Sequence, residues 1–265
     1  MGAFNSAMSS PNEEHGPGAL AQPGVLFAGG RPFLLTSRSS AMRALIVATS
    51  CNRLPSGHPT GLWAEEYADP YMALTDAGIE VIVTSPAGGV VPVDEKSKPS
   101  DSDAKAWAPA LSALQSTLPL ALVKDQLFDL IFLPGGHGPL VDLAIDPALQ
   151  DLLSRQDAQG KLIAAVCHGP AGLLHVRRSD GSPLLKGRRV TGFTNTEERL
   201  AGLHDKVPFL LEDAMKAQGG DFHSALLPML SHIERDGNLI TGQNPKSSHA
   251  IGKAMVEALH VAHAH

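Results

Sequence analysis

Short β-rich runs alternate with helical segments from Arg43 onward, and this alternation constrains the fold more than any other feature of the sequence. Parallel strands need a crossover connection, usually a helix, so this order predicts an α/β fold with a mostly parallel sheet and helices on both faces. An antiparallel hairpin is expected around Asp236-Gly237, between residues 231–234 and 239–241. The other strands are expected at residues 44–48, 80–84, 130–133 and 162–166, and helices at 65–77, 147–156, 208–217 and 247–260.

The composition indicates one large folded domain with an N-terminal extension. The chain has 265 residues, 43% of them hydrophobic, which is enough for a sizeable core that we place at residues 42–262. Residues 1–41 are rich in Gly, Pro, Ser and Ala and show no periodicity, so a disordered extension is expected there. No Lys or Arg precedes Arg31, so the basic start of a secretory signal is missing.

The charge and the cysteine content indicate which partners and which cellular compartment to expect. A formal net charge of −6 argues against a nucleic-acid partner, which would require a basic face. No apolar run approaches the roughly 18 residues of a membrane-spanning helix. Two cysteines, Cys51 and Cys167, cannot form a disulfide framework, which favours a reducing compartment. We therefore expect a cytoplasmic protein without a membrane or nucleic-acid partner.

Cys167 is the strongest candidate for a reactive residue. It follows the apolar strand at 162–166, and helical spacing begins directly after it. Ala165 and Gly169 are small, as the sharp turn of a nucleophile elbow requires. A helix that begins after Cys167 would direct its positive end at the sulfur and favour the thiolate by lowering the pKa of the thiol. The alternative is a buried structural cysteine.

A glycine-rich turn at residues 133–139 follows the preceding strand. Its glycines let backbone N–H groups approach a bound oxygen, so the N–H of Gly136 could form half of an oxyanion hole. The N–H of His168, the residue after the candidate nucleophile, would form the other half. Ordinary loop geometry explains such a turn equally well.

Two pairs of adjacent glutamates also follow strand ends. Glu65 and Glu66 lie at the start of the first helix, where one of them could hold a proton over Cys167. Glu197 or Glu198 could orient His168 and complete a Cys-His-Glu arrangement. Acidic residues in the first turn of a helix are common without any such role, and the residues alone leave both choices open.

The sequence contains six ordered motifs within the stretch from Met42 to Leu259. They are Thr-Gly-Leu-Trp-Ala-Glu-Glu (60–66), Ser-Pro-Ala-Gly-Gly (85–89), Leu-Pro-Gly-Gly-His-Gly (133–138), Ala-Val-Cys-His-Gly-Pro (165–170), Gly-Phe-Thr-Asn-Thr-Glu-Glu (192–198) and Thr-Gly-Gln-Asn-Pro-Lys-Ser-Ser (241–248). Together they resemble the ThiJ/PfpI superfamily of class I glutamine amidotransferase-like proteins. The resemblance is strongest to its heat-shock-chaperone-like branch, which includes glutathione-independent glyoxalases and protein deglycases.

The resemblance implies a flavodoxin-like three-layer sandwich and a set of site residues. By position, the nucleophile falls on Cys167 with His168 as its partner, the acid before the helix proline on Glu66, and the third acid on Glu198. We expect the substrate pocket to include His137 and Trp63. The resemblance further implies a homodimer. We predict no cofactor and no required metal, because no convincing set of metal ligands is identified.

The leading hypothesis is a glyoxalase III-type lyase that converts methylglyoxal to lactate. Thiolate attack on the aldehyde would give a hemithioacetal, which the N–H groups of Gly136 and His168 would stabilise. His168 or Glu66 would move a proton between the two carbons, and water would release lactate from the resulting thioester. Protein deglycase activity would use the same sulfur. A stress-related holdase chaperone or cysteine redox sensor is the alternative, and a Cys amidase or protease is a further one.

Overall fold

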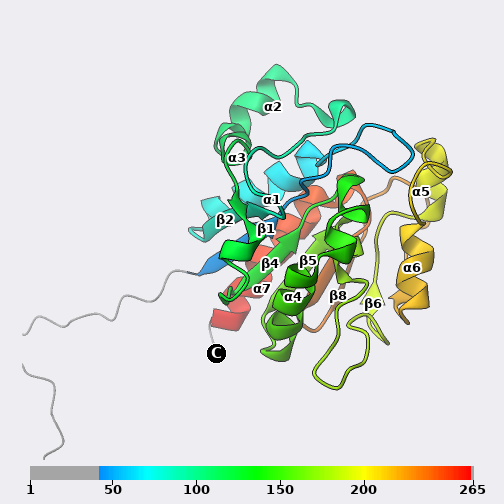
Figure 1. Cartoon of the computed structure of the whole chain (residues 1–265). Coiled ribbons are helices and arrows are strands. Elements are labelled where there is room, and N and C mark those ends of the chain that lie inside the picture. Colours follow the sequence, from blue (N-terminus) through cyan, green and yellow to red (C-terminus); the bar gives the residue numbers. More distant parts are fainter. Residues whose placement is uncertain (1–41, 264–265) are drawn as a thin grey trace, which may run out of the picture. The chain divides into compact units, whose positions relative to one another are not determined.

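The structure of the chain is a computed structural model that describes residues 42–263 (Figure 1). The predicted disordered extension at residues 1–41 lies outside the described residues. The described part forms a single α/β unit in which helices flank a central sheet.

The central sheet has seven strands in the order β3-β2-β1-β4-β5-β9-β8. All neighbouring pairs are parallel except β8 and β9, which form the predicted hairpin. The seven strands are β1 (Arg43–Val47), β2 (Glu80–Ser85), β3 (Leu118–Pro119), β4 (Leu130–Leu133), β5 (Leu162–Val166), β8 (Ile233–Asp236) and β9 (Leu239–Gly242). A separate parallel pair joins β6 (Arg189–Val190) and β7 (Asp221–Phe222). The predicted α/β fold with a mostly parallel sheet is therefore confirmed.

Helices cover both faces of this sheet. Helices α1 (Ala64–Asp76) and α7 (Ser248–His263) pack against each other on one face, and α4 (Pro147–Ala158) lies on the other (Figure 1). A side chain at Gly252 would press on Ala73 and Pro70, so this glycine brings α7 close to α1. Because both faces are covered, the central strands are continuous apolar runs; every residue of β4 and β5 is buried.

Shorter helices complete the unit: α2 (Asp101–Ala106), α3 (Ala108–Ala113), α5 (Asn195–Leu200) and α6 (Leu211–Ala217). Helix α6 begins three residues later than the sequence pattern predicts, and α7 extends three residues further, to His263. The four strands predicted between residues 44 and 166 are confirmed within one residue at each end.

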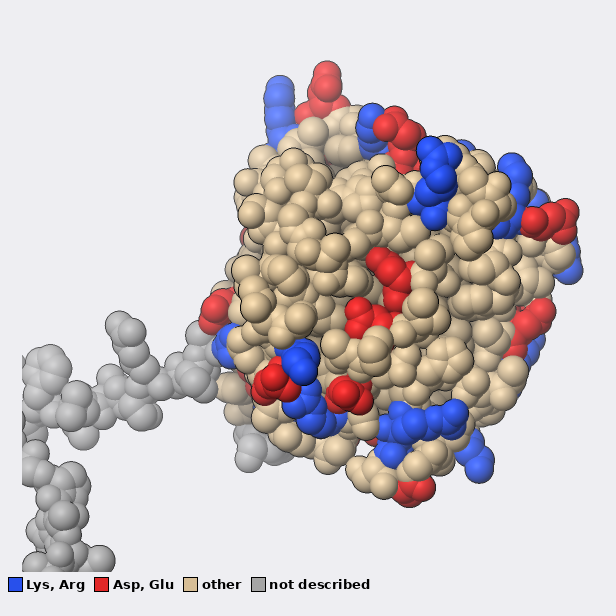
Figure 2. Space-filling model, in the orientation of Figure 1, with Lys and Arg blue, Asp and Glu red and all other residues tan. Residues whose placement is uncertain are grey.

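Lys and Arg side chains lie among Asp and Glu side chains around the rim of the face shown in Figure 2, whereas the middle of that face carries acidic side chains surrounded by uncharged residues. Within residues 42–263, no helix combines the length and the apolar character that crossing a membrane would require.

The topology brings the predicted motifs together. Strands β1, β4 and β5 are parallel neighbours, so the loops that follow them leave the sheet at the same edge. Those loops carry residues 48–63, 134–141 and 167–168. In a doubly wound sheet this edge is where ligands bind.

Candidate functional site

Cys167 occupies a strained turn directly after β5. Its φ of +58° lies in the left-handed region that residues other than glycine rarely adopt. The N–H of Cys167 donates to the carbonyl of Gly242 at 2.9 Å, and its carbonyl accepts from the N–H of Phe193 at 3.0 Å. A side chain at Gly169 would overlap the carbonyl of Leu133, so the turn needs glycine there. The predicted nucleophile elbow is present, and contacts from two other segments hold its backbone in place.

The prediction of an α-helix directly after Cys167 is wrong. Gly169–Leu173 form a 3-10 helix of 5 residues, because Gly169, Pro170 and Gly172 disfavour an α-helix. So short a segment contributes little dipole at the sulfur. Burial instead raises the pKa of Cys167 well above its ordinary value, and the neighbouring Glu66 acts in the same direction. The resting sulfur is therefore a thiol rather than the predicted thiolate.

Glu66 is the member of the first acidic pair that faces the sulfur. It belongs to α1 and is fully buried, whereas Glu65 is partly exposed. Burial raises the pKa of Glu66 to about 8, although the Cys167 thiol and the N–H groups of Gly136 and Gly135 act in the opposite direction. Neither carboxyl oxygen makes a hydrogen bond of good geometry within the described residues. Glu66 is consequently protonated at neutral pH and can donate its proton to a group that forms beside it.

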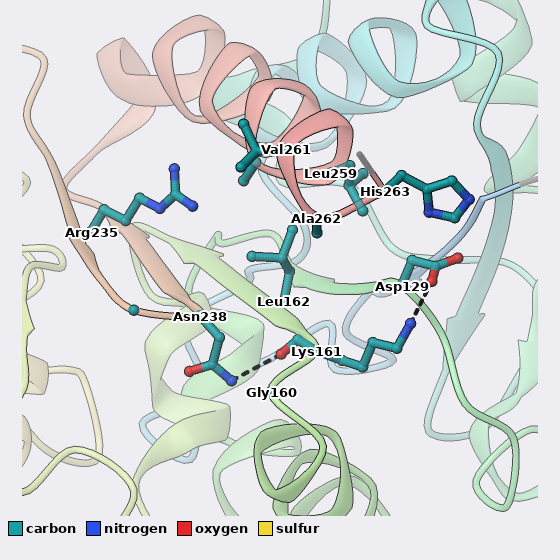
Figure 3. A pocket seen from close by; sticks show the side chains of 12 residues that line it. Asp129, Gly160, Lys161, Leu162, Arg235, Asn238, Leu259, Val261, Ala262 and His263 are labelled. Carbon is teal, nitrogen blue, oxygen red and sulfur yellow. Dashed lines mark hydrogen bonds and ion pairs between the residues drawn. The ribbon is translucent and has the colours of Figure 1, made fainter. Parts of the chain in front are cut away.

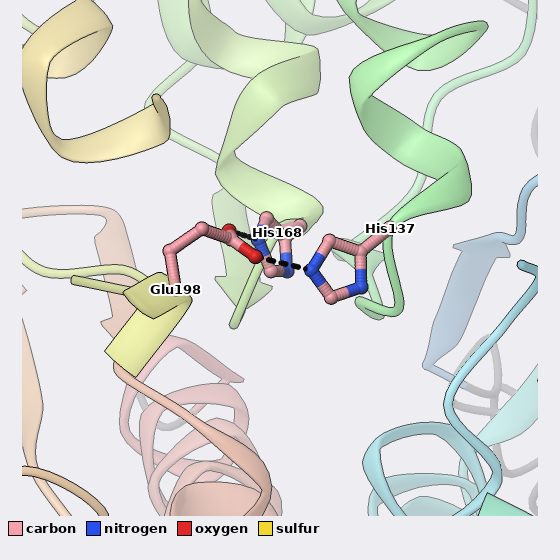
Figure 4. A group of neighbouring side chains, drawn as sticks. All are labelled: His137, His168 and Glu198. Atoms are coloured by element: carbon pink, nitrogen blue, oxygen red, sulfur yellow. Dashed lines mark hydrogen bonds and ion pairs between the residues drawn. The ribbon is translucent and has the colours of Figure 1, made fainter. Parts of the chain in front are cut away.

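His168 connects the sulfur of Cys167 to Glu198 through two contacts, and Figure 4 shows the one between His168 and Glu198. Nδ1 of His168 lies 3.3 Å from Sγ of Cys167, and Nε2 lies 2.7 Å from Oε2 of Glu198. A carboxylate can only accept, so Nε2 carries the hydrogen and Nδ1 is free to take a proton from the thiol. This is the base–orienter geometry of a catalytic triad.

The other carboxylate oxygen of Glu198 contacts a second histidine. Oε1 lies 2.7 Å from Nε2 of His137, and the His137 and His168 rings lie against each other with centroids 4.0 Å apart. Burial, followed by the neighbouring His137, lowers the pKa of His168 to about 4, so His168 is neutral at pH 7. Burial opposes ionisation of Glu198, but the two histidines outweigh it and lower the pKa of this carboxyl below its ordinary value. The cluster therefore holds an ionised Glu198.

Glu197, the neighbour of Glu198, has a structural role. Its carboxylate forms a capping box with Thr194 at the start of α5. It also accepts hydrogen bonds from the N–H of Met229 and from the side-chain amides of Gln243 and Asn244. Within this acidic pair, only Glu198 contacts His168.

Gly136 brings a backbone N–H close to the sulfur of Cys167. Its φ is +87°, and a side chain there would collide with the carbonyl of Gly61 and the N–H of Trp63. The N–H of Gly136 interacts with Cys167 and lowers the pKa of its thiol, against the larger effect of burial. Only glycine fits this position, which is where the predicted oxyanion hole would lie.

A cavity of about 230 Å³ opens above Cys167. Its wall includes Trp63 and His137, the two residues predicted for the substrate pocket, together with Gly136 and Phe193. Most of the remaining wall is apolar, with Asp94 and Lys96 as charged exceptions. Glu66, His168 and Glu198 lie behind this wall and do not line the cavity.

A second cavity, of about 240 Å³, lies at the opposite ends of the strands (Figure 3). Its polar groups are largely paired with one another: Lys161 contacts Asp129 at 2.8 Å, and Asn238 donates to the carbonyl of Lys161 at 2.9 Å. No cysteine lines it. The candidate site is therefore the cavity at Cys167.

His137, His168 and Glu198 could also act as a metal-binding set, which the sequence analysis did not identify. One ligand atom from each lies within 4.8 Å of the others. An ion there would have to replace both 2.7 Å hydrogen bonds and the protons on the two Nε2 atoms. The absence of a required metal stays a prediction.

Comparisons with known proteins agree on the relationship. The sequence model of the DJ-1/PfpI family matches residues 60–258. The glutathione-independent glyoxalase HSP31 of Saccharomyces cerevisiae is 30% identical over 241 residues, 82% of this chain and 98% of the yeast protein. Glyoxalase 3 of Candida albicans is 27% identical, covering 78% of this chain and 94% of its own length. The crystal structure of the rapid encystment protein of Francisella tularensis is 31% identical and covers 82% of this chain and 99% of its own, with a TM-score of 0.76.

Proposed function

The chain belongs to the DJ-1/PfpI family, and on that premise we propose that it is a glutathione-independent glyoxalase of the glyoxalase III type that converts methylglyoxal to lactate. Relatives of about 30% identity bear the name glutathione-independent glyoxalase. The observation that most supports the proposal is the contact chain from Cys167 through His168 to Glu198, at 3.3 and 2.7 Å, with the neutral Glu66 beside the same sulfur.

In the first step, Cys167 adds to the aldehyde carbon. His168 accepts the thiol proton at Nδ1, and Glu198 stabilises the imidazolium that forms. The new C–S bond turns the aldehyde oxygen into an alkoxide near the N–H groups of Gly136 and His168. Protonated Glu66 donates a proton to that oxygen, which gives a neutral hemithioacetal. Because Glu66 has a pKa of about 8, it carries that proton at neutral pH.

In the later steps, the hemithioacetal rearranges and is hydrolysed. A base removes the proton from the former aldehyde carbon, an enediol forms across the two carbons, and the second carbon takes up a proton. The result is a thioester of 2-hydroxypropionate on Cys167. Water adds to its carbonyl and the C–S bond breaks. The leaving sulfur takes back the proton held by His168, Glu66 takes the proton that the water gives up, and the product is released as lactate. Methylglyoxal and one water are consumed, and no electron acceptor is needed.

The proposal is tested by measuring methylglyoxal loss and lactate formation without glutathione, for the wild-type protein beside Cys167→Ala and Glu66→Gln. We expect lactate from the wild type and none above background from Cys167→Ala. Glu65→Gln is the matched control for the second variant, because Glu65 is adjacent in sequence and is not directed at the sulfur. Lactate formation by the wild type that does not exceed the Cys167→Ala background would refute the proposal.

A deglycase reaction on early glycation adducts would use the same thiol. Its test must separate attack on the adduct from removal of free aldehyde. The initial rate of adduct loss is therefore compared with the spontaneous rate of aldehyde release from the adduct. Only a loss faster than that release indicates direct deglycation.

A holdase chaperone is the second candidate, and one surface feature supports it. Four apolar side chains within residues 226–230 are exposed: Leu226, Leu227, Met229 and Leu230 are 96%, 59%, 43% and 50% accessible. Such a patch is typical of sites that bind other proteins. A chaperone would suppress aggregation of a heated client equally well as wild type and as Cys167→Ala. A redox-sensor role has less support, because burial raises the pKa of Cys167 and so disfavours the oxidisable thiolate.

A further inference from the structure

We propose that His137 is the acid–base residue that carries the proton between the two carbons of the substrate, while His168 serves only the thiol. This inference rests on the proposed glyoxalase function and assigns to His137 the proton transfer for which the sequence suggested His168 or Glu66. It gives the two histidines of the cluster separate tasks, with Glu198 as their common carboxylate.

Access to the cavity distinguishes His137 from the other candidates. The base must reach a carbon of the bound aldehyde, and the aldehyde lies in the cavity above Cys167. His137 lines that cavity. Glu66 and His168 do not line it; both are fully buried beside the sulfur, where the proposed mechanism assigns them the alkoxide and the thiol proton.

The hydrogen bonding of His137 leaves one ring nitrogen free for the substrate. Nε2 donates to Oε1 of Glu198 at 2.7 Å, so in the neutral ring Nδ1 carries the lone pair. Within the described residues Nδ1 has no hydrogen-bond partner, and it is not among the buried polar atoms that are sealed from the surface without one. Nδ1 of His137 can therefore accept a proton from a group in the cavity.

Packing holds the His137 ring in this orientation. The ring of His168 lies against it, and the Phe193 ring approaches it edge-on, with centroids 6.1 Å apart and an interplanar angle of 77°. Only 8% of the His137 side chain is accessible. A base fixed in this way loses little freedom when the substrate binds, which favours proton transfer.

The carboxylate of Glu198 allows the two histidines to act in sequence. Oε2 stabilises His168 as it takes the thiol proton, and Oε1 stabilises His137 as it takes the carbon proton. When His137 removes the C1 proton, the C1–H electron pair becomes the C1–C2 π bond and the C2 carbonyl oxygen becomes an enediolate oxygen. His137 then returns its proton to C2, and the proton of the C1 hydroxyl passes to the neighbouring C2 oxygen as the thioester carbonyl forms. The protein ends this step with the protons that it began with.

The test compares His137→Gln with wild type in three measurements: lactate formation, alkylation of Cys167 by iodoacetamide, and the isotope effect with methylglyoxal deuterated at C1. A Gln side chain can still donate to Glu198 but cannot carry a proton. His232→Gln is the matched control, because His232 also contacts a glutamate, Glu234 at 3.0 Å, and does not line the cavity.

We expect His137→Gln to lower kcat by about 100-fold or more, with a larger isotope effect and with alkylation within about twofold of wild type. His168→Ala should instead slow alkylation itself. Added imidazole should restore part of the turnover of His137→Ala, which opens the cavity wall, and none of that of His168→Ala.

Two results would overturn the assignment. In one, His137→Gln retains kcat within about threefold of wild type. In the other, alkylation falls as much as turnover, which would make His137 a support for the thiol. If the wild type forms no lactate, the proposed function fails and the assignment fails with it; lactate from the wild type with either result above refutes the assignment alone.

Discussion

Replacing Glu66 by Gln should stabilise the protein in a pH-dependent way while it removes activity. In the folded protein, burial raises the pKa of Glu66 from its ordinary 4.5 to about 8. The unfolded chain exposes the same carboxyl to water, where it ionises near 4.5. Between these values the folded state retains a proton that the unfolded state loses, so folding is opposed by the free energy of keeping the carboxyl neutral.

The sign and magnitude follow from linkage. A group whose folded pKa is raised contributes its full stability below the unfolded pKa, and this contribution is lost as pH rises through the folded pKa. At pH 7 the carboxyl is about 2.5 pH units above its ordinary pKa, which at about 1.4 kcal/mol per unit costs about 3 kcal/mol. Above pH 8 the free-energy cost of keeping Glu66 buried reaches a plateau of about 5 kcal/mol. Gln keeps the shape of the neutral acid and does not ionise, so the free energy of unfolding of the variant does not fall with pH for this reason.

The measurement is the free energy of unfolding in urea, for wild type and Glu66→Gln, at several pH values between 4.5 and 8. The difference between the two proteins should grow with pH by about 1.4 kcal/mol per unit. His168 titrates near 4 in both folded proteins and cancels in the difference. Glu65→Gln, whose carboxyl is partly solvated, should show a much smaller slope. A difference that is constant across this pH range would refute the reasoning, because it would place the folded pKa of Glu66 near its ordinary value.

Three further results are expected. Gly136→Ala should lower the free energy of unfolding by about 1–3 kcal/mol in urea titrations, because φ is +87° and the new Cβ meets Gly61 and Trp63. Glu197→Gln should destabilise by about 1–3 kcal/mol, since an amide nitrogen would then face donors that now meet a carboxylate; intact stability would contradict the structural role of Glu197. Dialysis against a chelator should leave lactate formation unchanged. Added Zn²⁺ should inhibit lactate formation by binding to His137, His168 and Glu198.

Much of the fold follows from sequence patterns because the central strands are long enough to show them. Strands β1, β2, β4 and β5 are apolar runs of 4 to 6 residues with turn signals beside them. Strands β3, β6 and β7 have 2 residues each and escape prediction, since no periodicity can be read from so few. The α-helix expected after Cys167 fails for a different reason: the small residues that permit the sharp turn also disfavour helix there.

The adjacent glutamates show what a linear pattern leaves open. Glu65 and Glu66 share the first turn of α1, and Glu197 and Glu198 share that of α5, so helix signals describe both members of each pair equally. Successive residues of a helix point about 100° apart, and only tertiary packing decides which of them meets Cys167 or His168. The packing gives each residue of a pair a different environment: Glu66 is fully buried and neutral, while Glu65 is partly solvated.

His137 is the residue whose contacts were least visible in the sequence, although a signal for it exists. It lies in the turn after β4, and β4 pairs in parallel with β5, so this turn must leave the sheet beside the elbow that carries Cys167 and His168. That argument predicts proximity but cannot predict that Glu198, from a helix 61 residues later, reaches both imidazoles. A shared carboxylate is a property of three segments packed together. It allows one buried negative charge to orient two histidines, so no second carboxylate is needed beside a thiol that becomes negative in the proposed reaction.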